Sequence, residues 1–303
     1  AGCALVGSLA ADLPSARIAL VEVGEAADSQ AVMTPSHWPQ TLKGKHAFDY
    51  QTVPQPLLKR RRIDYPRGRG LGGSSLINVM IYSRGFKADW DAMPEGWRSH
   101  DVKPVLEALE ARLHLTELSA GTYGRAVASA AESCSIPHRE DGFWEEHGAT
   151  TSYRAMIDSR TGRRLDIYRS LGANRSNVTL VSGTVERLLF GNDGCRALGV
   201  ELCSVSGKTE KRALHLRELG EIVLCAGAID SPKILQLSGV GPPDLLRKFG
   251  INQVRSLPIG QGLQDHTLLP IVSLGEPKPL AKELSPNSVQ GWIHDEPNGI
   301  QIV

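Results

Sequence analysis

The chain has 303 residues, of which 41% are hydrophobic and 22% are charged, so it is long enough for one or two domains with a sizeable core. Its 34 basic and 33 acidic residues leave a net charge of +1, which excludes the broad basic surface typical of a nucleic-acid-binding protein. The 31 glycines and 18 prolines favour a loop-rich α/β enzyme over a helical bundle.

The five cysteines include no CxxC pair, which argues against a disulfide framework and against a cysteine-based zinc site. We therefore expect no metal site and mostly buried thiols. No apolar run reaches the roughly 18 residues that cross a bilayer, so no membrane span is expected. The sequence starts without a Met or a leader, which leaves targeting open, with a cytoplasmic location slightly favoured over secretion. Nothing in the sequence indicates an oligomeric state.

The first segment is predicted to form a helix, a turn and a parallel strand. Small apolar residues recur at helical spacing over residues 2–13, and an apolar strand follows at 17–24, ending in Glu22. Glu22 comes twenty residues after Gly2, about where a dinucleotide-binding unit places the carboxylate that accepts a hydrogen bond from the adenosine ribose. A simple exposed acid at the end of a strand is the alternative for Glu22. Only Ala1 and Gly2 could belong to the glycine turn, so the sequence is expected to begin inside the motif.

The most informative stretch is residues 66–85. It follows a proline-rich excursion over residues 30–66 that contains a short predicted hairpin around 57–65. Four glycines, at positions 68, 70, 72 and 73, precede Ser74 and Ser75, either of which could cap a short apolar helix. Without a Cβ, such backbone can touch a phosphate or a flat ring. Glycines that merely serve turns are the alternative interpretation.

Residues 99–113 are predicted to form a helix capped by Ser99 or Asp101, with Val102, Val105, Leu106, Leu109 and Leu113 on a core face. A second helix is expected at 123–134, and the rest of 120–170 has no clear pattern. From residue 177, short alternating strands predict an antiparallel meander that returns to a buried strand at 221–225. Helices are then expected from Ser231-Pro232 to Gly239 and between Pro242 and Gly250.

Four segments together resemble the glucose-methanol-choline (GMC) family of flavin oxidoreductases. They are the AG…LVEVG beginning, GRGLGGSSLINVMIYSRG at 68–85, GAIDSPKILQLSGVG at 227–241 and PIGQGLQDH at 258–266. The chain is identified as a fragment or truncated member that lacks the first strand and the C-terminal catalytic segment.

The resemblance implies an α/β fold: a Rossmann-like FAD-binding domain with an antiparallel meander, plus the beginning of an antiparallel-sheet substrate domain. The FAD-binding domain would cover residues 1–265, with substrate-domain segments inserted around 86–170, and a truncated substrate domain would start at 266–303.

The resemblance also implies FAD as cofactor and nine residues around it. Gly2 would close the pyrophosphate turn, and Glu22 would hold the ribose. Gly72, Gly73 and Ser74 would lie along the cofactor, and Asn78, Val79 and Met80 near its isoalloxazine ring. Val185 would approach the adenine, and its alternative is a core position.

The implied reaction is oxidation of a small-molecule alcohol at its CH–OH group, with hydride passing to flavin N5. The family carries its catalytic base, a histidine, beyond the QDH motif, so no catalytic residue is assigned and the chain alone is expected to be inactive. His266 and His294, the histidines after residue 241, lack the family's surrounding pattern. The alternatives are a degenerate, non-catalytic remnant that binds FAD weakly or not at all, and an NAD(P)-dependent Rossmann dehydrogenase, which would rest on Glu22 alone.

Overall fold

The computed structural model describes residues 1–118, 121–139, 150–152, 154–203, 211–265, 292–295 and 301–302. The chain forms two compact units. Unit 1 comprises Ala1–Glu25 and Gly172–Gly275, and unit 2 comprises Ala26–Leu171 and Glu276–Val303. The predicted FAD-binding domain, residues 1–265, includes parts of both units, and the domain boundary at residue 265 stays a prediction.

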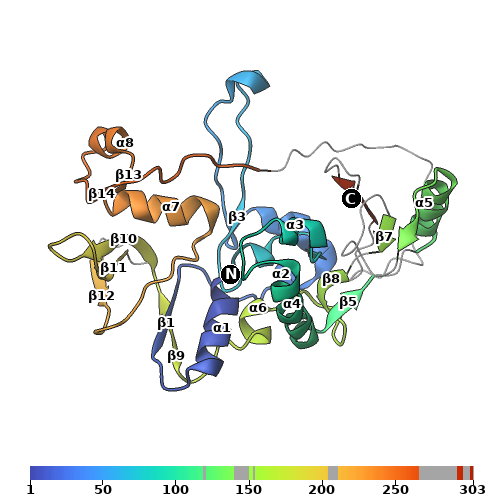
Figure 1. The fold of residues 1–303 in the computed structure, drawn as a ribbon, viewed down its shortest axis with the longest axis horizontal. Coiled ribbons are helices and arrows are strands. Elements are labelled where there is room, and N and C mark those ends of the chain that lie inside the picture. Colours follow the sequence, from blue (N-terminus) through green and yellow to red (C-terminus); the bar gives the residue numbers. More distant parts are fainter. Residues whose placement is uncertain are drawn as a thin grey trace. The chain divides into compact units, whose positions relative to one another are not determined.

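Unit 1 begins with the predicted helix and strand. Helix α1 (Gly2–Asp12) buries Cys3, Val6 and Ala10, the small residues that recur on one face in the sequence. Strand β1 (Ile18–Glu22) pairs in parallel with β9 (Val178–Ser182), with Ile18 opposite Val178 and Glu22 opposite Ser182. Helix α1 lies beside this strand pair (Figure 1). The parallel pairing confirms the α/β start and places Glu22 at the carboxyl end of its strand.

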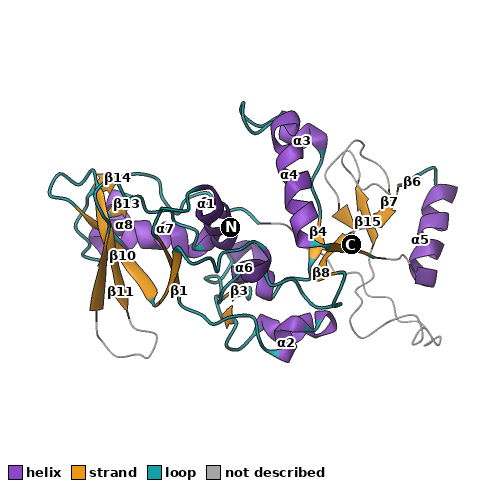
Figure 2. Ribbon diagram, turned by 90° about the horizontal axis from the view of Figure 1, so that it is seen from below, coloured by secondary structure: helices purple, strands orange, loops and turns teal. Residues whose placement is uncertain are grey.

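The predicted meander is a three-stranded antiparallel sheet in the order β10, β11, β12, with bounds Thr184–Phe190, Ala197–Cys203 and Lys211–His215. Helix α7 (Gly227–Leu237) covers one face of it (Figure 2), where Ile234 joins Leu188 and Leu202 in the core. The turn predicted at residues 192–194 is confirmed by Gly194, whose φ of +64° is left-handed. The turn expected at residues 206–207 lies outside the described residues.

Three details of this region differ from the predictions. Strand β9 pairs with β1 and not with the meander. Residues 221–225 form no strand: Val223 is 58% exposed and Cys225 is exposed, while Ile222 and Leu224 pack against the core. The alternating pattern therefore marked the inward side chains correctly but not the strand partners. Helix α7 begins at Gly227 and contains Pro232, so Ser231-Pro232 is not its start.

The remainder of unit 1 is short. Helix α7 ends before Gly239, whose φ is +86°, and Pro242 caps helix α8 (Pro243–Lys248), as predicted. Strands β13 (Val240–Gly241) and β14 (Arg255–Ser256) flank this helix in the sequence and pair in parallel.

Unit 2 is built from short elements. Its described helices are α2 (Gln30–Met33), α3 (Lys87–Asp91), α4 (Ser99–Leu113), α5 (Gly121–Ser133) and α6 (Ile167–Ser170), and its described 3-10 helices are η1 (Pro35–Leu42), η2 (Pro56–Leu58) and η3 (Gly73–Leu76). Its strands form a pair, β2 (Ala47–Phe48) with β3 (Arg67–Gly68); an antiparallel sheet of β4 (Ile81–Tyr82), β8 (Arg154–Asp158) and β5 (Leu115–Glu117); and a sheet of β6 (His138–Arg139), β7 (Thr150–Ser152), β15 (Trp292–Asp295) and β16 (Gln301–Ile302).

The hairpin predicted around residues 57–65 is present between β2 and β3, and its two arms run out to η2 at the tip (Figure 1). Bridges between Gln51 and Asp64 and between Gln55 and Arg61 hold the arms together. Lys59 and Arg60 turn the chain with φ of 53° and 58°.

Helix α4 occupies the predicted segment, but its cap and its core face differ from the prediction. Arg98 is the N-cap residue, and its backbone N–H donates to Asp101 Oδ2 at 3.1 Å. Leu113 is buried, whereas Val105 is 67% exposed. Val102, Leu106 and Leu109 are half-buried, so Val105 is the one exposed residue of the predicted face.

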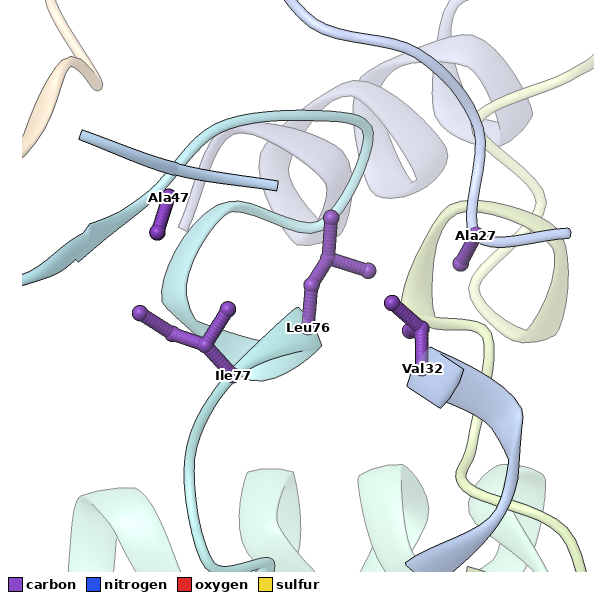
Figure 3. Packing of buried hydrophobic residues seen from close by; sticks show 5 residues of the cluster. All are labelled: Ala27, Val32, Ala47, Leu76 and Ile77. Carbon is purple, nitrogen blue, oxygen red and sulfur yellow. The ribbon is translucent and has the colours of Figure 1, made fainter. Parts of the chain in front are cut away.

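Two clusters form the core around residues 71–80. Figure 3 shows Leu76 and Ile77 facing Val32, Ala27 and Ala47, so the end of the glycine-rich stretch is anchored by its apolar residues.

In the described chain no helix is long and apolar enough to cross a bilayer. The expectation of mostly buried thiols is wrong: Cys3 is buried, whereas Cys134, Cys195 and Cys225 are exposed.

Candidate functional site

The glycine-rich stretch of unit 2 is a tight loop that only glycine can form. A Cβ on Gly68 would lie closer to the carbonyl of Gly73 and to Ser74 than real Cβ atoms come. The Gly68 N–H donates to Ser74 Oγ at 3.0 Å, and the Gly73 N–H donates to the Gly70 carbonyl at 2.8 Å. The loop is therefore closed by its own backbone and by one serine.

The serine cap that the sequence predicts is wrong. Gly72, with φ of +119°, is the N-cap residue of η3, and no side chain caps this turn. Ser74 Oγ accepts from Gly68, and Ser75 Oγ donates to the Gly72 carbonyl at 2.8 Å. The predicted apolar helix is a single 3-10 turn over Gly73–Leu76, because Ile77 already leaves the helical conformation.

Gly73 is the open position of the loop. Its φ is +58°, and a Cβ built on it would meet no atom within 4 Å. An outside group can approach the backbone closely where the chain is left-handed and the space that a Cβ would fill is empty. This part of the loop fits a phosphate or a flat ring, and the exposed Ser74 next to it adds a hydroxyl.

The three residues predicted near the flavin ring have different surroundings. Asn78 is exposed and Val79 is half-buried. Met80 has φ of +65° and a fully buried side chain that packs with Leu118, Ala155 and Ile157. Because the side chain of Met80 is buried in the core, only its backbone is left for the predicted contact with the flavin ring.

Arg164 is a functional candidate that the sequence did not reveal. Its side chain is 1% exposed, its Nε donates to the Val32 carbonyl at 2.9 Å, and its Nη1 donates to the Ser75 carbonyl and to Asn78 Oδ1, both at 2.8 Å. Its Nη2 is buried with no hydrogen-bond partner in the described chain. Burial lowers the pKa of Arg164 to about 10, so the guanidinium stays protonated at neutral pH and brings a positive charge to the loop.

The other predicted residues, Gly2, Glu22 and Val185, lie in unit 1. Gly2 opens α1 next to the extended segment 221–225, where a Cβ on Gly2 would lie 3.2 Å from the Cβ of Cys225. Glu22 is half-buried, and its Oε1 accepts the Gly24 N–H at 2.9 Å. Val185 packs against the core cluster that contains Leu188, which favours the core alternative for its side chain.

Neither the two histidines after residue 241 nor any group of metal-ligating side chains in the described chain forms a further candidate site. His266 lies outside the described residues, and His294 lies in β15, which pairs with β7 and β16. In the described part of the chain, no three His, Cys, Asp or Glu side chains gather as metal ligands. The predicted absence of a metal site and the nine cofactor contacts both stay predictions.

Comparison with known proteins decides the family. Residues 9–268 match the family model described as GMC oxidoreductase. The chain belongs to the GMC oxidoreductase family. Curated GMC relatives include the oxygen-dependent choline dehydrogenases of Ectopseudomonas mendocina, 36% identical over 252 residues, and Stenotrophomonas maltophilia, 37% identical over 250 residues. Each alignment covers 74% of this chain and 43% of the relative, so the chain spans less than half the length of these proteins.

Solved structures agree with the GMC assignment. Pyridoxine 4-oxidase from Mesorbium loti superposes with a TM-score of 0.73 at 26% identity, over 85% of this chain and 54% of that protein. An FAD-dependent oxidoreductase from Chaetomium thermophilum gives a TM-score of 0.75 at 24% identity, over 85% of this chain and 49% of that protein, which supports the fold. The GMC oxidoreductases are FAD-dependent flavoenzymes. The resemblance found in the sequence is thereby confirmed, and so is its fold class.

Proposed function

We propose that this GMC oxidoreductase binds FAD, with the glycine loop of unit 2 as one contact, and that it serves oxidation of a small-molecule alcohol at its CH–OH group. The observation that carries the proposal is the open, left-handed Gly73 in a loop closed on itself, within a segment that matches the GMC family. NAD(P)-dependent chemistry would rest on Glu22 alone, and the family match argues against it.

Each predicted residue has a simple physical task in this proposal. Bound FAD would accept the hydride from the carbinol carbon, which is the demanding chemistry of the reaction. Gly72 and Gly73 leave room for the cofactor, and Glu22 would accept a hydrogen bond from a ribose hydroxyl. Asn78 would offer its exposed amide to the ring. None of these groups is a base for the alcohol proton.

We further propose that the 303-residue chain does not turn over alone, because no assigned residue takes the alcohol proton. FAD uptake without reduction by alcohol is the expected behaviour. Choline is the first substrate to test, since curated relatives carry the name choline dehydrogenase. Bleaching of the flavin absorbance on anaerobic addition of choline or a short primary alcohol would contradict the inactivity and support the reaction class.

FAD uptake by the purified chain tests the binding proposal directly. The chain is incubated with excess FAD, passed over a desalting column, and scanned for the flavin absorbance band. Retained flavin at a ratio near one per chain is expected. A colourless protein would contradict the proposal and support the alternative of a degenerate remnant that does not bind the cofactor.

Gly73→Ala locates the site, and Gly250→Ala is its matched control. Both glycines have left-handed φ, +58° and +65°, and neither would place a Cβ within 4 Å of another atom. Each variant should lose about 1 kcal/mol of stability from the strained backbone. Only Gly73→Ala should weaken FAD binding, by about tenfold or more, since its methyl group would enter the cofactor's space. Equal FAD affinities in the two variants would remove the glycine loop from the site.

A further inference from the structure

Arg164 connects the predicted flavin loop to the interior of unit 2. Its three hydrogen bonds reach Val32, Ser75 and Asn78, which are 132, 89 and 86 residues away in the sequence. Two of these partners belong to the stretch that contains the glycine loop. The side chain therefore ties the end of this loop to α2 at one buried point.

The charge of Arg164 is not neutralised by an acid. In the described chain no carboxylate pairs with Arg164, since burial alone shifts its pKa, and one of its terminal nitrogens is buried without a partner. A buried cation is costly unless it is paired. Its acceptors here are two backbone carbonyls and an amide, which leave the net positive charge in place beside the loop.

The contact with Asn78 fixes the direction of the Asn78 amide. An arginine offers only donors, so the amide must turn its oxygen toward Arg164 and its NH₂ group the other way. The contact joins Nη1 of Arg164 to Oδ1 of Asn78 at 2.8 Å. Because Asn78 is exposed, its NH₂ group stays available as a donor, and the adjacent cation polarises the amide and strengthens that donor.

We propose that Arg164 is a positioning residue of the flavin site, which orients the Asn78 amide so that it donates a hydrogen bond to the bound isoalloxazine ring. The inference rests on the proposed FAD binding. A reduced flavin carries more negative charge on its ring than an oxidised one, so the polarised Asn78 donor stabilises the reduced form and raises the reduction potential of the flavin.

The test compares four variants of the full chain loaded with FAD: Arg164→Met, Arg164→Lys, Asn78→Ala and the double variant Arg164→Met/Asn78→Ala. The measured quantities are the FAD dissociation constant and the midpoint potential. Arg164→Met should weaken FAD binding up to about tenfold, the effect of losing the hydrogen bond from the Asn78 amide to the ring, and should lower the midpoint potential. Arg164→Lys keeps the charge but not the guanidinium fork that reaches the three acceptors, so its potential should lie between those of Arg164→Met and the wild type.

The double variant shows whether Arg164 acts through Asn78. If it does, losing Arg164 should have no further effect once Asn78 is gone, so the double variant should match Asn78→Ala and not the sum of the two single changes. Arg163→Met is the control: Arg163 is the neighbouring, exposed arginine, so the same change in net charge should leave both quantities at the wild-type values.

Three results would contradict the role of Arg164 specifically. They are an unchanged potential in Arg164→Met, an equal drop in Arg163→Met, or fully additive effects in the double variant. Should Arg164→Met not fold, an unchanged potential in the exposed-site variant Asn78→Ala overturns the proposal by itself. A wild-type chain that takes up no FAD would instead contradict the proposed function, so the two failures are distinguishable.

Discussion

Unit 2 holds arginines in two contrasting settings. Arg84, just after β4, meets Glu110 of α4 through two hydrogen bonds of 2.5 and 2.6 Å, and Glu110 also accepts from Tyr82 and Arg154 at 2.8 and 2.9 Å. Arg164 has only carbonyl and amide acceptors. The first centre is a compensated ion cluster that joins α4 to the β4–β8 pair, and the second leaves its charge unneutralised next to the predicted flavin loop.

The contrast indicates a division of labour. Around Glu110, burial alone would raise the pKa of this carboxyl, but hydrogen bonds from Arg84 and Tyr82 outweigh it and lower the pKa. Burial and the Glu110 hydrogen bond raise the pKa of Tyr82. Every group there stabilises its neighbour in the folded state. The charge of Arg164 gains little stabilisation from its surroundings, so we expect Arg164 to act on the cofactor site and not on the stability of the fold.

The largest effect on folding should follow from Glu110→Gln. The substitution leaves Arg84 and Arg154 without their carboxylate, and Glu110 is only 10% exposed. Breaking a partly buried pair in this way should lower the free energy of unfolding by about 2 to 3 kcal/mol. Urea unfolding followed by circular dichroism measures it. FAD affinity should stay near the wild-type value in this variant, the reverse of the pattern expected for Arg164→Met.

A result in the other direction would break the comparison. If Glu110→Gln lowers FAD affinity as much as Arg164→Met does, the two centres do not differ in function. If Arg164→Met destabilises the fold more than Glu110→Gln, Arg164 is primarily a stabilising residue.

The pH dependence of stability sharpens the same comparison. The pKa of Glu110 is lowered in the folded state from an ordinary value of 4.5. A carboxylate of this kind stabilises the fold above its unfolded pKa, and the contribution is lost as pH falls through the folded pKa. The difference in unfolding free energy between wild type and Glu110→Gln should therefore be constant near neutral pH and shrink below about pH 4.5. A difference that stays constant down to pH 3 would show that Glu110 is not the titrating group.

Local patterns predicted the elements that depend on neighbouring residues. The helix and strand at residues 2–22, the hairpins, and the helix between Pro242 and Gly250 follow from periodicity and turn residues. Local patterns failed where a segment distant in the sequence decides whether a strand is paired or a side chain is buried. Residues 221–225 alternate like a strand, but no described strand forms a ladder with them, and Val105 has the spacing of a core residue but little to pack against.

In the candidate site, too, local sequence indicated some features, and distant residues decide the others. In the sequence, the glycines at 72 and 73 indicated either close approach of a ligand or a turn, and the structure gives both of them left-handed backbone. The serine cap failed, because hydroxyl groups that could cap a helix instead close the loop onto Gly68 and Gly72. Arg164 gave no signal, because its three partners are more than 80 residues away and nothing in Gly162-Arg163-Arg164 tells which arginine is buried. Long-range burial of a polar group is invisible to local patterns.

The smallest effect is expected for an exposed ion pair, which sets the baseline for both arginine centres. Arg247 and Asp244 of α8 lie 3.1 Å apart, three positions along the helix, with side chains 77% and 93% exposed. Water and salt screen such a pair, so Arg247→Gln should change the free energy of unfolding by about 0.3 kcal/mol. Urea unfolding at low and high salt measures it, and the small effect should vanish at high salt. A loss comparable to that of Glu110→Gln would mean that burial is not what separates strong from weak charge contacts in this protein, and the distinction between Glu110 and Arg164 would lose its physical basis.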